Sequence, residues 1–294
     1  MSLDPIKELV MNKNLLQQSI NKFQSELFSS IKTKSYNGTN YQNGQKAKEA
    51  LIRSQTLIFN VHESVKQSFY KTLTTKTSYK WTVHPPLNQT NPELKIYGKL
   101  KGKDQDIVYL RTPLRSTIIE DGPNIGQTDF VGIEATMKSI IIGVRSQMSS
   151  VDKNFDTLME RAFAETLNLR LRTPVITMGE VYVLPIEELD DQAMLENKIV
   201  FCGRKVKVDK FIRTFDSFSG RSDLKLDDQY KYDASALVLV DFKQTPPKII
   251  FNRDDLKLYG YDEDICSMFK HICAEGFDER LLKNYIKFQI DSGL

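Results

Sequence analysis

The stretch from Gly126 to Leu171, GQTDFVGIEATMKSIIIGVRSQMSSVDKNFDTLMERAFAETLNLRL, contains the features that decide the fold. An acidic segment leads into the apolar run Ser139–Ile142, and polar residues follow at Arg145 and Gln147. Because side chains alternate across a strand, Gly143, Arg145 and Gln147 share one face. After the strand, apolar residues recur every three or four positions, which predicts a helix from Val151 to about Leu169.

Further strands are predicted on both sides of this stretch. Val175–Leu184 and Ser235–Phe242 are almost entirely apolar, as expected of strands that are covered on both faces. Leu94–Leu100 and Asp106–Arg111 flank the turn-like Lys101–Asp104 and suggest a hairpin. The alternation of strands and helices predicts an α/β fold with a mixed sheet flanked by helices.

The front of the chain has a helical pattern. Apolar residues spaced by three or four positions predict helices from Pro5 to about Ile31 and from about Gln45 to Leu73. Thr74–Asn91 contains two adjacent prolines and is expected to be irregular, with the character of a linker. The predicted organisation is therefore a helical N-terminal region, 1–90, followed by an α/β domain, 91–294.

The composition of the 294 residues, 40% hydrophobic and 27% charged, is typical of a globular protein with a sizeable core. No apolar run is long enough for a membrane span, and the first residues lack the pattern of a signal peptide, so we expect a cytoplasmic protein without a membrane partner. The three cysteines show no paired spacing, which argues against disulfides or a zinc site.

Positive charge is concentrated in the first 105 residues, which contain 16 Lys or Arg and 7 Asp or Glu. Lysines such as Lys99, Lys101 and Lys103 are candidates for contacts with the phosphates of DNA. An ordinary solvated surface explains the same surplus equally well.

The central stretch offers the groups needed for phosphodiester hydrolysis. That reaction requires acidic oxygens to hold Mg²⁺ and a cation or polar group beside the attacked phosphate. Asp129 and Glu160 are the predicted metal ligands, and we expect them to converge beside Arg145. Glu134 is a reserve acid, and Glu165 is a rival to Glu160.

Each of these residues also has an ordinary structural explanation. Asp129 follows a glycine-containing turn and could cap it, and Arg145 with Glu160 could be a plain strand-to-helix ion pair. Glu134 and Lys138 could both face solvent.

The segments SIIIGVRSQMSS (139–150), NFDTLMERAFAETLNL (154–169) and GEVYVLP (179–185) resemble type II restriction endonucleases of the PD-(D/E)xK superfamily. FDSFSGRSD (215–223) and ALVLVDFKQTPPKI (236–249) are similar to later parts of such proteins. The resemblance covers about residues 127–252. It implies a restriction-endonuclease-like fold, Mg²⁺-dependent cleavage of double-stranded DNA, and a homodimer.

The chain departs from the motif of that superfamily, E-x-K-x-Q, at two positions. Gly143 replaces the glutamate, Arg145 replaces the lysine, and Gln147 matches. Gln147 and Arg145 are then expected at the attacked phosphate and water. The candidates for contacts with DNA bases are Arg170, Arg172 and Arg221. Because arginine does not readily give up a proton, the alternative is a nuclease-like fold without catalysis that binds DNA or serves in assembly.

Overall fold

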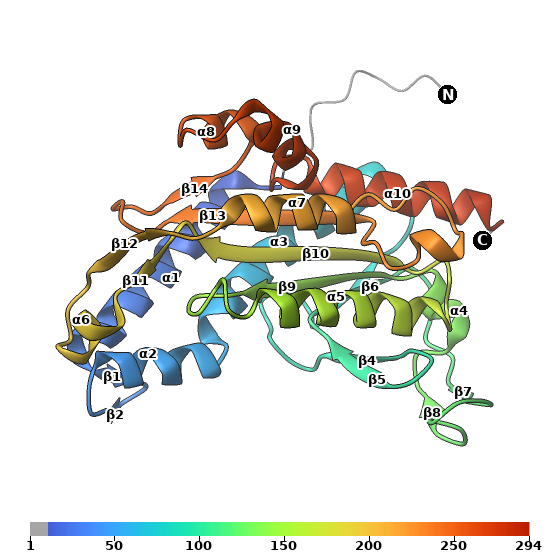
Figure 1. Cartoon of the computed structure of the whole chain (residues 1–294). Helices are drawn as coiled ribbons and strands as arrows, with labels where there is room; N and C mark the ends of the chain where they lie inside the picture. The colour runs from blue at the N-terminus through green and yellow to red at the C-terminus, as the bar shows by residue number, and fades with distance from the viewer. Residues whose placement is uncertain (1–10, 294) are drawn as a thin grey trace.

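The fold is built on a six-stranded mixed sheet with the strand order β14-β13-β10-β9-β6-β3 (Figure 1). The computed structural model describes residues 11–293. The strands are β3 Thr82–His84, β6 Ile107–Leu110, β9 Ile140–Ser146, β10 Thr177–Pro185, β13 Ala234–Asp241 and β14 Lys248–Ile250. β9, β10 and β13 are parallel, whereas β3, β6 and β14 pair antiparallel with their neighbours. The predicted mixed α/β architecture is confirmed.

Helices cover both faces of the sheet (Figure 1). One face packs against α1 Lys13–Thr33, α3 Thr56–Lys76 and α10 Phe277–Asp291, and the other against α5 Phe155–Arg170, α7 Val208–Phe218 and α9 Glu263–Ile272. The alternation along β9 produces this division, because Ile140, Ile142 and Val144 belong to the core with α1, α3 and α10, while Ile141 belongs to a core with α5. No helix within residues 11–293 is long and apolar enough to cross a membrane.

The predicted helix from Gln45 to Leu73 is interrupted. The structure has α2, Gly44–Arg53, and then α3 from Thr56. Gln55 between them adopts a left-handed conformation with φ of 61°, which cannot continue a right-handed helix. The interruption turns α2 away from the line of α3.

The region predicted to be irregular, Thr74–Asn91, contains β3 at the edge of the main sheet. Residues of α1 and α3 also share one hydrophobic core with β6, β9, β10 and β13. The domain boundary near residue 90 stays a prediction, and the first turns of the helix expected from Pro5 lie outside the described residues.

The hairpin near residue 100 differs from the prediction. β4, Leu94–Tyr97, pairs with β5, Gly102–Gln105, whereas the apolar run after Asp106 joins the main sheet as β6. The other small ladders are β1 Ser35–Tyr36 with β2 Thr39–Asn40, β7 Thr117–Ile118 with β8 Thr128–Asp129, and β11 Glu187–Leu189 with β12 Phe201–Lys205. Short helices are α4 Ile133–Met137, α6 Asp191–Leu195, α8 Arg253–Lys257 and a 3₁₀ turn Leu226–Asp228. The hairpin shift places Asp106 where the chain enters the main sheet.

Candidate functional site

A cluster of charged side chains surrounds Arg145 near the C-terminal end of β9. Arg145 Nη1 lies 3.3 Å from Glu180 Oε1, and Nη2 forms an ion pair with Glu165 Oε2. The other oxygen of Glu165 accepts a hydrogen bond from Lys103 Nζ at 2.5 Å. The cluster therefore joins β5, β9, β10 and α5, which lie far apart in the sequence.

The carboxylate of Glu180 fills the space that is open because Gly143 has no side chain. The two residues are partners in the parallel register of β9 and β10, so they are on the same face of the sheet as Arg145. A Cβ added at position 143 would overlap Glu180 Oε2. Glycine at 143 thus allows the neighbouring strand to supply a carboxylate at this place.

The environment of Glu180 opposes its charge. Its side chain is 2% exposed, and neither carboxylate oxygen has a hydrogen-bond partner among residues 11–293. Burial raises the pKa of Glu180 to about 7, with Arg145 opposing the rise and Glu165 and Asp106 adding to it. The ion pair at 3.3 Å is thus the main compensation for this buried group.

Glu165 is held in the charged form. Burial works against its charge, but the cations Arg145 and Lys103 outweigh burial and lower the pKa of Glu165. Two acids beside one arginine therefore have pKa values that move in opposite directions.

Asp106 adds a third carboxylate. Its Oδ2 accepts a hydrogen bond from the backbone nitrogen of Val144 at 2.8 Å, which fixes the side chain against β9. Its negative charge raises the pKa values of both Glu180 and Arg145. The negative charges of Asp106 and Glu165 therefore both act on Glu180.

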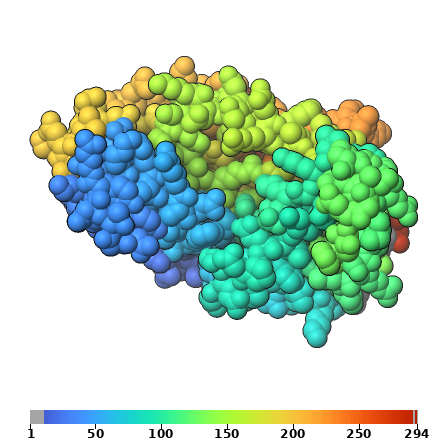
Figure 2. Space-filling model, turned by 90° about the horizontal axis from the view of Figure 1, so that it is seen from below, coloured from blue at the N-terminus to red at the C-terminus, as the bar shows by residue number. Residues whose placement is uncertain are grey.

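The cluster lies at a cleft with a volume of about 490 Å³. Figure 2 shows a hollow between the N-terminal helices, the β4–β5 hairpin and α5. The lining includes Gln55 from the break between α2 and α3, His62 from α3 and Arg161 from α5, together with Arg145 and Asp106. Basic and polar side chains therefore line this cleft, together with the carboxylate of Asp106.

A second hollow of about 330 Å³ adjoins the cleft. It shares Lys103, Arg145 and Arg161 with the first hollow and adds Lys101 and Glu165. The cationic side chains thus follow a path from the cleft toward the β4–β5 hairpin.

The structure does not assemble the predicted metal pair, Asp129 and Glu160. Asp129 is fully buried at the end of β8, where its Oδ1 accepts hydrogen bonds from the backbone nitrogens of Val131 and Gly132 and its Oδ2 pairs with Arg172 at 2.7 Å. Glu160 is exposed on α5. The correction has a physical reason, since Asp129 caps a turn and pairs with the partly buried Arg172.

The remaining predicted catalytic residues have separate locations. Glu134 lies on α4, is exposed, and pairs with Lys138 at 3.0 Å. Its exposure agrees with the alternative given above, in which Glu134 faces solvent. Gln147 lines the cleft, and its side-chain nitrogen donates to the carbonyl of Ser149 at 2.5 Å. Arg145 and Gln147 are brought to one place, whereas Glu134 is not in that group.

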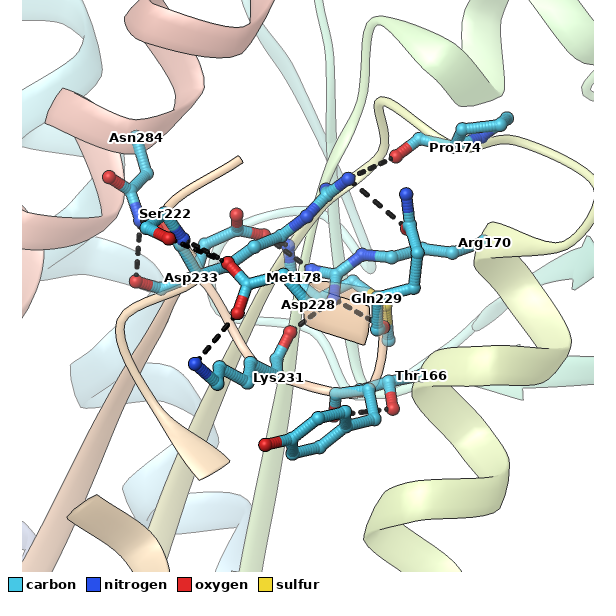
Figure 3. A network of polar contacts seen from close by, with 12 residues as sticks. Thr166, Arg170, Pro174, Met178, Ser222, Asp228, Gln229, Lys231, Asp233 and Asn284 are labelled. Carbon is cyan, nitrogen blue, oxygen red and sulfur yellow. Dashed lines mark hydrogen bonds and ion pairs between the residues drawn. The ribbon is translucent and has the colours of Figure 1, made fainter. Parts of the chain in front are cut away.

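Arg170 and Arg221 are buried parts of a polar network rather than exposed readers of DNA, which corrects the prediction. Figure 3 shows Arg170 within this network. Arg170 Nη2 lies 2.7 Å from Asp233 Oδ2, and its Nη1 donates to the carbonyl of Gln229 at 2.8 Å. Arg221 Nη2 donates to the carbonyl of Pro174 at 2.7 Å. Both arginines are 1% exposed. Their hydrogen bonds connect the end of α5 and the residues after it to the loop before β13.

Of the other predicted DNA contacts, Arg172 is also bound internally, to Asp129 and to the carbonyl of Tyr97 at 3.0 Å. Lys99 forms an ion pair with Asp121. Lys101 is exposed beside the second hollow, and Lys103 faces both hollows. Only the last two combine the predicted charge with a place beside the cluster.

Two residues of the cluster were not predicted as site residues, and a third was only the rival candidate. Glu180 had a signal in the sequence, because it is the only charged residue in the apolar run Val175–Leu184. Asp106 had a weaker signal, as an acid at the start of a strand. Glu165, the rival to Glu160, is the acid of α5 that faces Arg145.

The acids suit a hard divalent cation such as Mg²⁺, which prefers carboxylate oxygens. The two buried oxygens of Glu180 without hydrogen-bond partners provide capacity for such a ligand. Within residues 11–293, no three His, Cys, Asp or Glu side chains already converge as metal ligands, and Arg145 separates Glu165 from Glu180. A metal would have to displace the guanidinium to reach both Glu165 and Glu180.

Comparisons with family models, with curated proteins and with solved structures found no match for this chain. Its function must accordingly be inferred from the geometry and chemistry of the site.

Proposed function

We propose that this protein hydrolyses phosphodiester bonds of double-stranded DNA in a Mg²⁺-dependent reaction at the cleft beside Arg145, as a restriction endonuclease does. One observation carries the proposal: Glu180 occupies the space beside Gly143 and faces Arg145 together with Glu165. The glutamate missing from β9 is thereby supplied by β10. The arrangement restores an acid next to the cation at the end of the strand.

Asp106 and Glu180 are the proposed ligands of Mg²⁺, with Glu165 as a further ligand from α5. When bound, Mg²⁺ lowers the pKa of a coordinated water and polarises the phosphate. Asp106 is already oriented by its hydrogen bond from Val144, so it requires little reorganisation to bind. Glu180 is held in a site of low solvent exposure, where its interaction with a cation is strong.

Arg145 acts on the phosphate and does not remove a proton. A guanidinium remains charged at any ordinary pH, but its planar fork matches two oxygens of a phosphate. Arg145 thus stabilises the negative charge that develops on the attacked group. Gln147, which lies just after the end of β9 and lines the cleft, orients the attacking water.

The cations on the path beside the cluster hold the DNA backbone. Lys101, Lys103 and Arg161 line the two hollows, and each neutralised phosphate releases counterions, which makes affinity dependent on salt. This interaction positions the duplex without reading its sequence.

Digestion of a sequence-diverse plasmid, with and without Mg²⁺, tests the proposal. We expect discrete fragments from the unaltered protein and a loss of rate of more than about 100-fold in Glu180→Gln and Asp106→Asn, as for removal of other electrostatic groups of active sites. Glu160→Gln, at the exposed acid of α5, is the matched control and should cleave normally. Equal rates in Glu180→Gln and the control would contradict the assignment.

A second candidate function is a DNA-binding or assembly module of the same fold without catalysis. The specific observation in its favour is that Arg145 already pairs with both Glu165 and Glu180, which places a positive charge between the acids without a metal. This candidate predicts salt-dependent binding of duplex DNA, no fragments at any Mg²⁺ concentration, and equal affinity in Glu180→Gln.

A homodimer is the proposed assembly, since a two-fold symmetric protein matches a palindromic site. Exposed apolar side chains in the segment that includes β7 and β8 support a contact with another chain: Ile118, Ile125 and Phe130 are 58%, 66% and 72% exposed. Sedimentation equilibrium of the unaltered protein and of Phe130→Asp tests this assembly, and dissociation in the variant is the expected result.

A further inference from the structure

Arg145 occupies the position between the two acids that a divalent cation would have to take. Its Nη1 faces Glu180 and its Nη2 faces Glu165, so one guanidinium serves both carboxylates. A metal cation that bridged the two acids would need the space that this guanidinium occupies, so the two cannot be there together.

The charges of the cluster lead to the same conclusion. Asp106, Glu165 and Glu180 are three acids, and Arg145 and Lys103 are two cations. Addition of a divalent cation with Arg145 in place would leave net positive charge in a site of low exposure, where repulsion is strong. Removal of Arg145 from the acids would leave a site with a surplus of negative charge.

Arg145 has a route out of this position and a partner outside it. Its side chain is 22% exposed, whereas that of Glu180 is 2% exposed, so the arginine can move into the cleft while the acid stays. Arg145 lines both hollows. A phosphate in the cleft offers the guanidinium two oxygens in the geometry that it prefers.

We infer that Arg145 is an internal counter-ion that keeps Glu165 and Glu180 closed to divalent cations until a DNA phosphate draws its guanidinium into the cleft. This inference rests on the proposed function and describes how that site is regulated. DNA and metal then bind cooperatively, and by linkage each raises the affinity of the protein for the other by the same factor. Metal without substrate binds weakly, which limits unproductive occupancy of the site.

Mn²⁺ binding, measured by calorimetry in the absence of DNA, tests the inference without reliance on activity. Arg145→Gln should bind Mn²⁺ at least about 10-fold more tightly than the unaltered protein, within the usual range of coupling between sites. A duplex with phosphorothioate linkages, which resists cleavage, should raise the Mn²⁺ affinity of the unaltered protein but not that of Arg145→Gln. Equal Mn²⁺ affinity of the two proteins without DNA would overturn the inference.

Lys103→Gln provides a second variant in case Arg145→Gln does not fold, which a thermal melt would reveal. Among residues 11–293 the ammonium group of Lys103 pairs with Glu165, and its side chain is 37% exposed, so its loss should raise Mn²⁺ affinity less. Because Lys103 is also proposed to hold the DNA backbone, the effect of DNA is compared at duplex concentrations that saturate each variant, where it should remain. An effect of DNA that disappears in Lys103→Gln would argue against Arg145 as the moving group.

Glu180→Gln separates failure of the inference from failure of the proposed function. If Mn²⁺ binding to the unaltered protein depends on Glu180 but Arg145→Gln binds no more tightly, only the counter-ion role is overturned. If Glu180→Gln leaves Mn²⁺ binding unchanged with and without DNA, the metal site itself is refuted and the inference falls with it.

Discussion

Glu180 of β10 and Gly143 of β9 are register partners that share one volume: the carboxylate of the first lies where a side chain of the second would be. Gly143→Ala should therefore displace Glu180 and reduce both Mn²⁺ affinity and cleavage. The double variant Gly143→Glu/Glu180→Gly moves the acid back to β9 and should recover Mn²⁺ binding relative to Glu180→Gly alone. Calorimetry of the three variants checks this relationship.

The control for this exchange is Gly179→Ala, at the neighbouring residue of β10. An added Cβ there meets Leu281 and Phe277 at 3.0 Å, so the change disturbs packing on the opposite face without touching the acids. A loss of Mn²⁺ affinity in Gly179→Ala as large as in Gly143→Ala would indicate a general defect of the sheet.

Asp278 should make stability depend on pH. Its Oδ2 accepts hydrogen bonds from Ser68 Oγ at 2.7 Å and Thr72 Oγ1 at 3.3 Å, but burial dominates and raises its pKa from 3.8 to about 6. The folded state thus holds the proton more tightly than the unfolded state, and this stabilisation is lost as pH rises from about 4 to about 6. The free energy of unfolding should fall by roughly 3 kcal/mol over that window, and less in Asp278→Asn.

Denaturant unfolding at a series of pH values measures this effect as the difference between the unaltered protein and Asp278→Asn. Asp264→Asn, at an aspartate of α9 whose side chain is 68% exposed, is the control and should follow the unaltered protein. Parallel curves for all three proteins would refute the role of Asp278.

Replacement of Gln55 by glycine should stabilise the folded protein, because Gln55 has a positive φ. A residue other than glycine in the left-handed region costs about 1–2 kcal/mol, and the change to glycine would relieve this strain. Part of the gain in stability is offset because glycine has greater freedom in the unfolded chain. Gln55→Gly should therefore raise the free energy of unfolding by about 0.5–1 kcal/mol. Gln67→Gly, the same change inside α3, should lower it by about 1 kcal/mol, and thermal or urea denaturation compares the two.

Two arginines of α5 should have opposite roles. Arg170→Met breaks a fully buried ion pair with Asp233 and should cost about 3–5 kcal/mol of stability, with unchanged DNA affinity of the folded protein. Arg161→Gln, at an exposed residue that lines both hollows, should leave stability unchanged, weaken DNA binding and reduce its salt dependence by about one unit of slope. Fluorescence anisotropy with labelled duplex at several salt concentrations, together with denaturant melts, distinguishes the two roles.

The elements of the fold that the sequence predicts well are those with a strong local pattern. β9, α5, β10 and β13 occur within a few residues of their predicted positions because continuous apolar runs and three-to-four spacing reflect burial directly. The break at Gln55 and the short edge strand β3 have no such pattern. A left-handed glutamine and a three-residue strand are determined by packing with distant parts of the chain.

The candidate site was predictable only in its centre. Arg145 and Gln147 follow from the strand pattern, but their acidic neighbours depend on the register between β9 and β10 and on the orientation of α5. The same limitation explains the arginines predicted to contact DNA, since the sequence does not reveal that Arg170 and Arg221 have buried partners. Residue type indicates the chemistry, whereas long-range pairing decides where it is used.

The walls of the cleft are rooted in opposite faces of one sheet: α3 shares a core with Val144, and the start of α5 shares another with Tyr182. Because both walls are packed on the same sheet, the cleft can widen only if the sheet deforms. We therefore expect its width to be nearly constant. A nucleic acid that enters must then supply the flexibility. Under the proposed function, easily bent base-pair steps would be preferred before any base edge is read, because stiff duplexes cost more to fit.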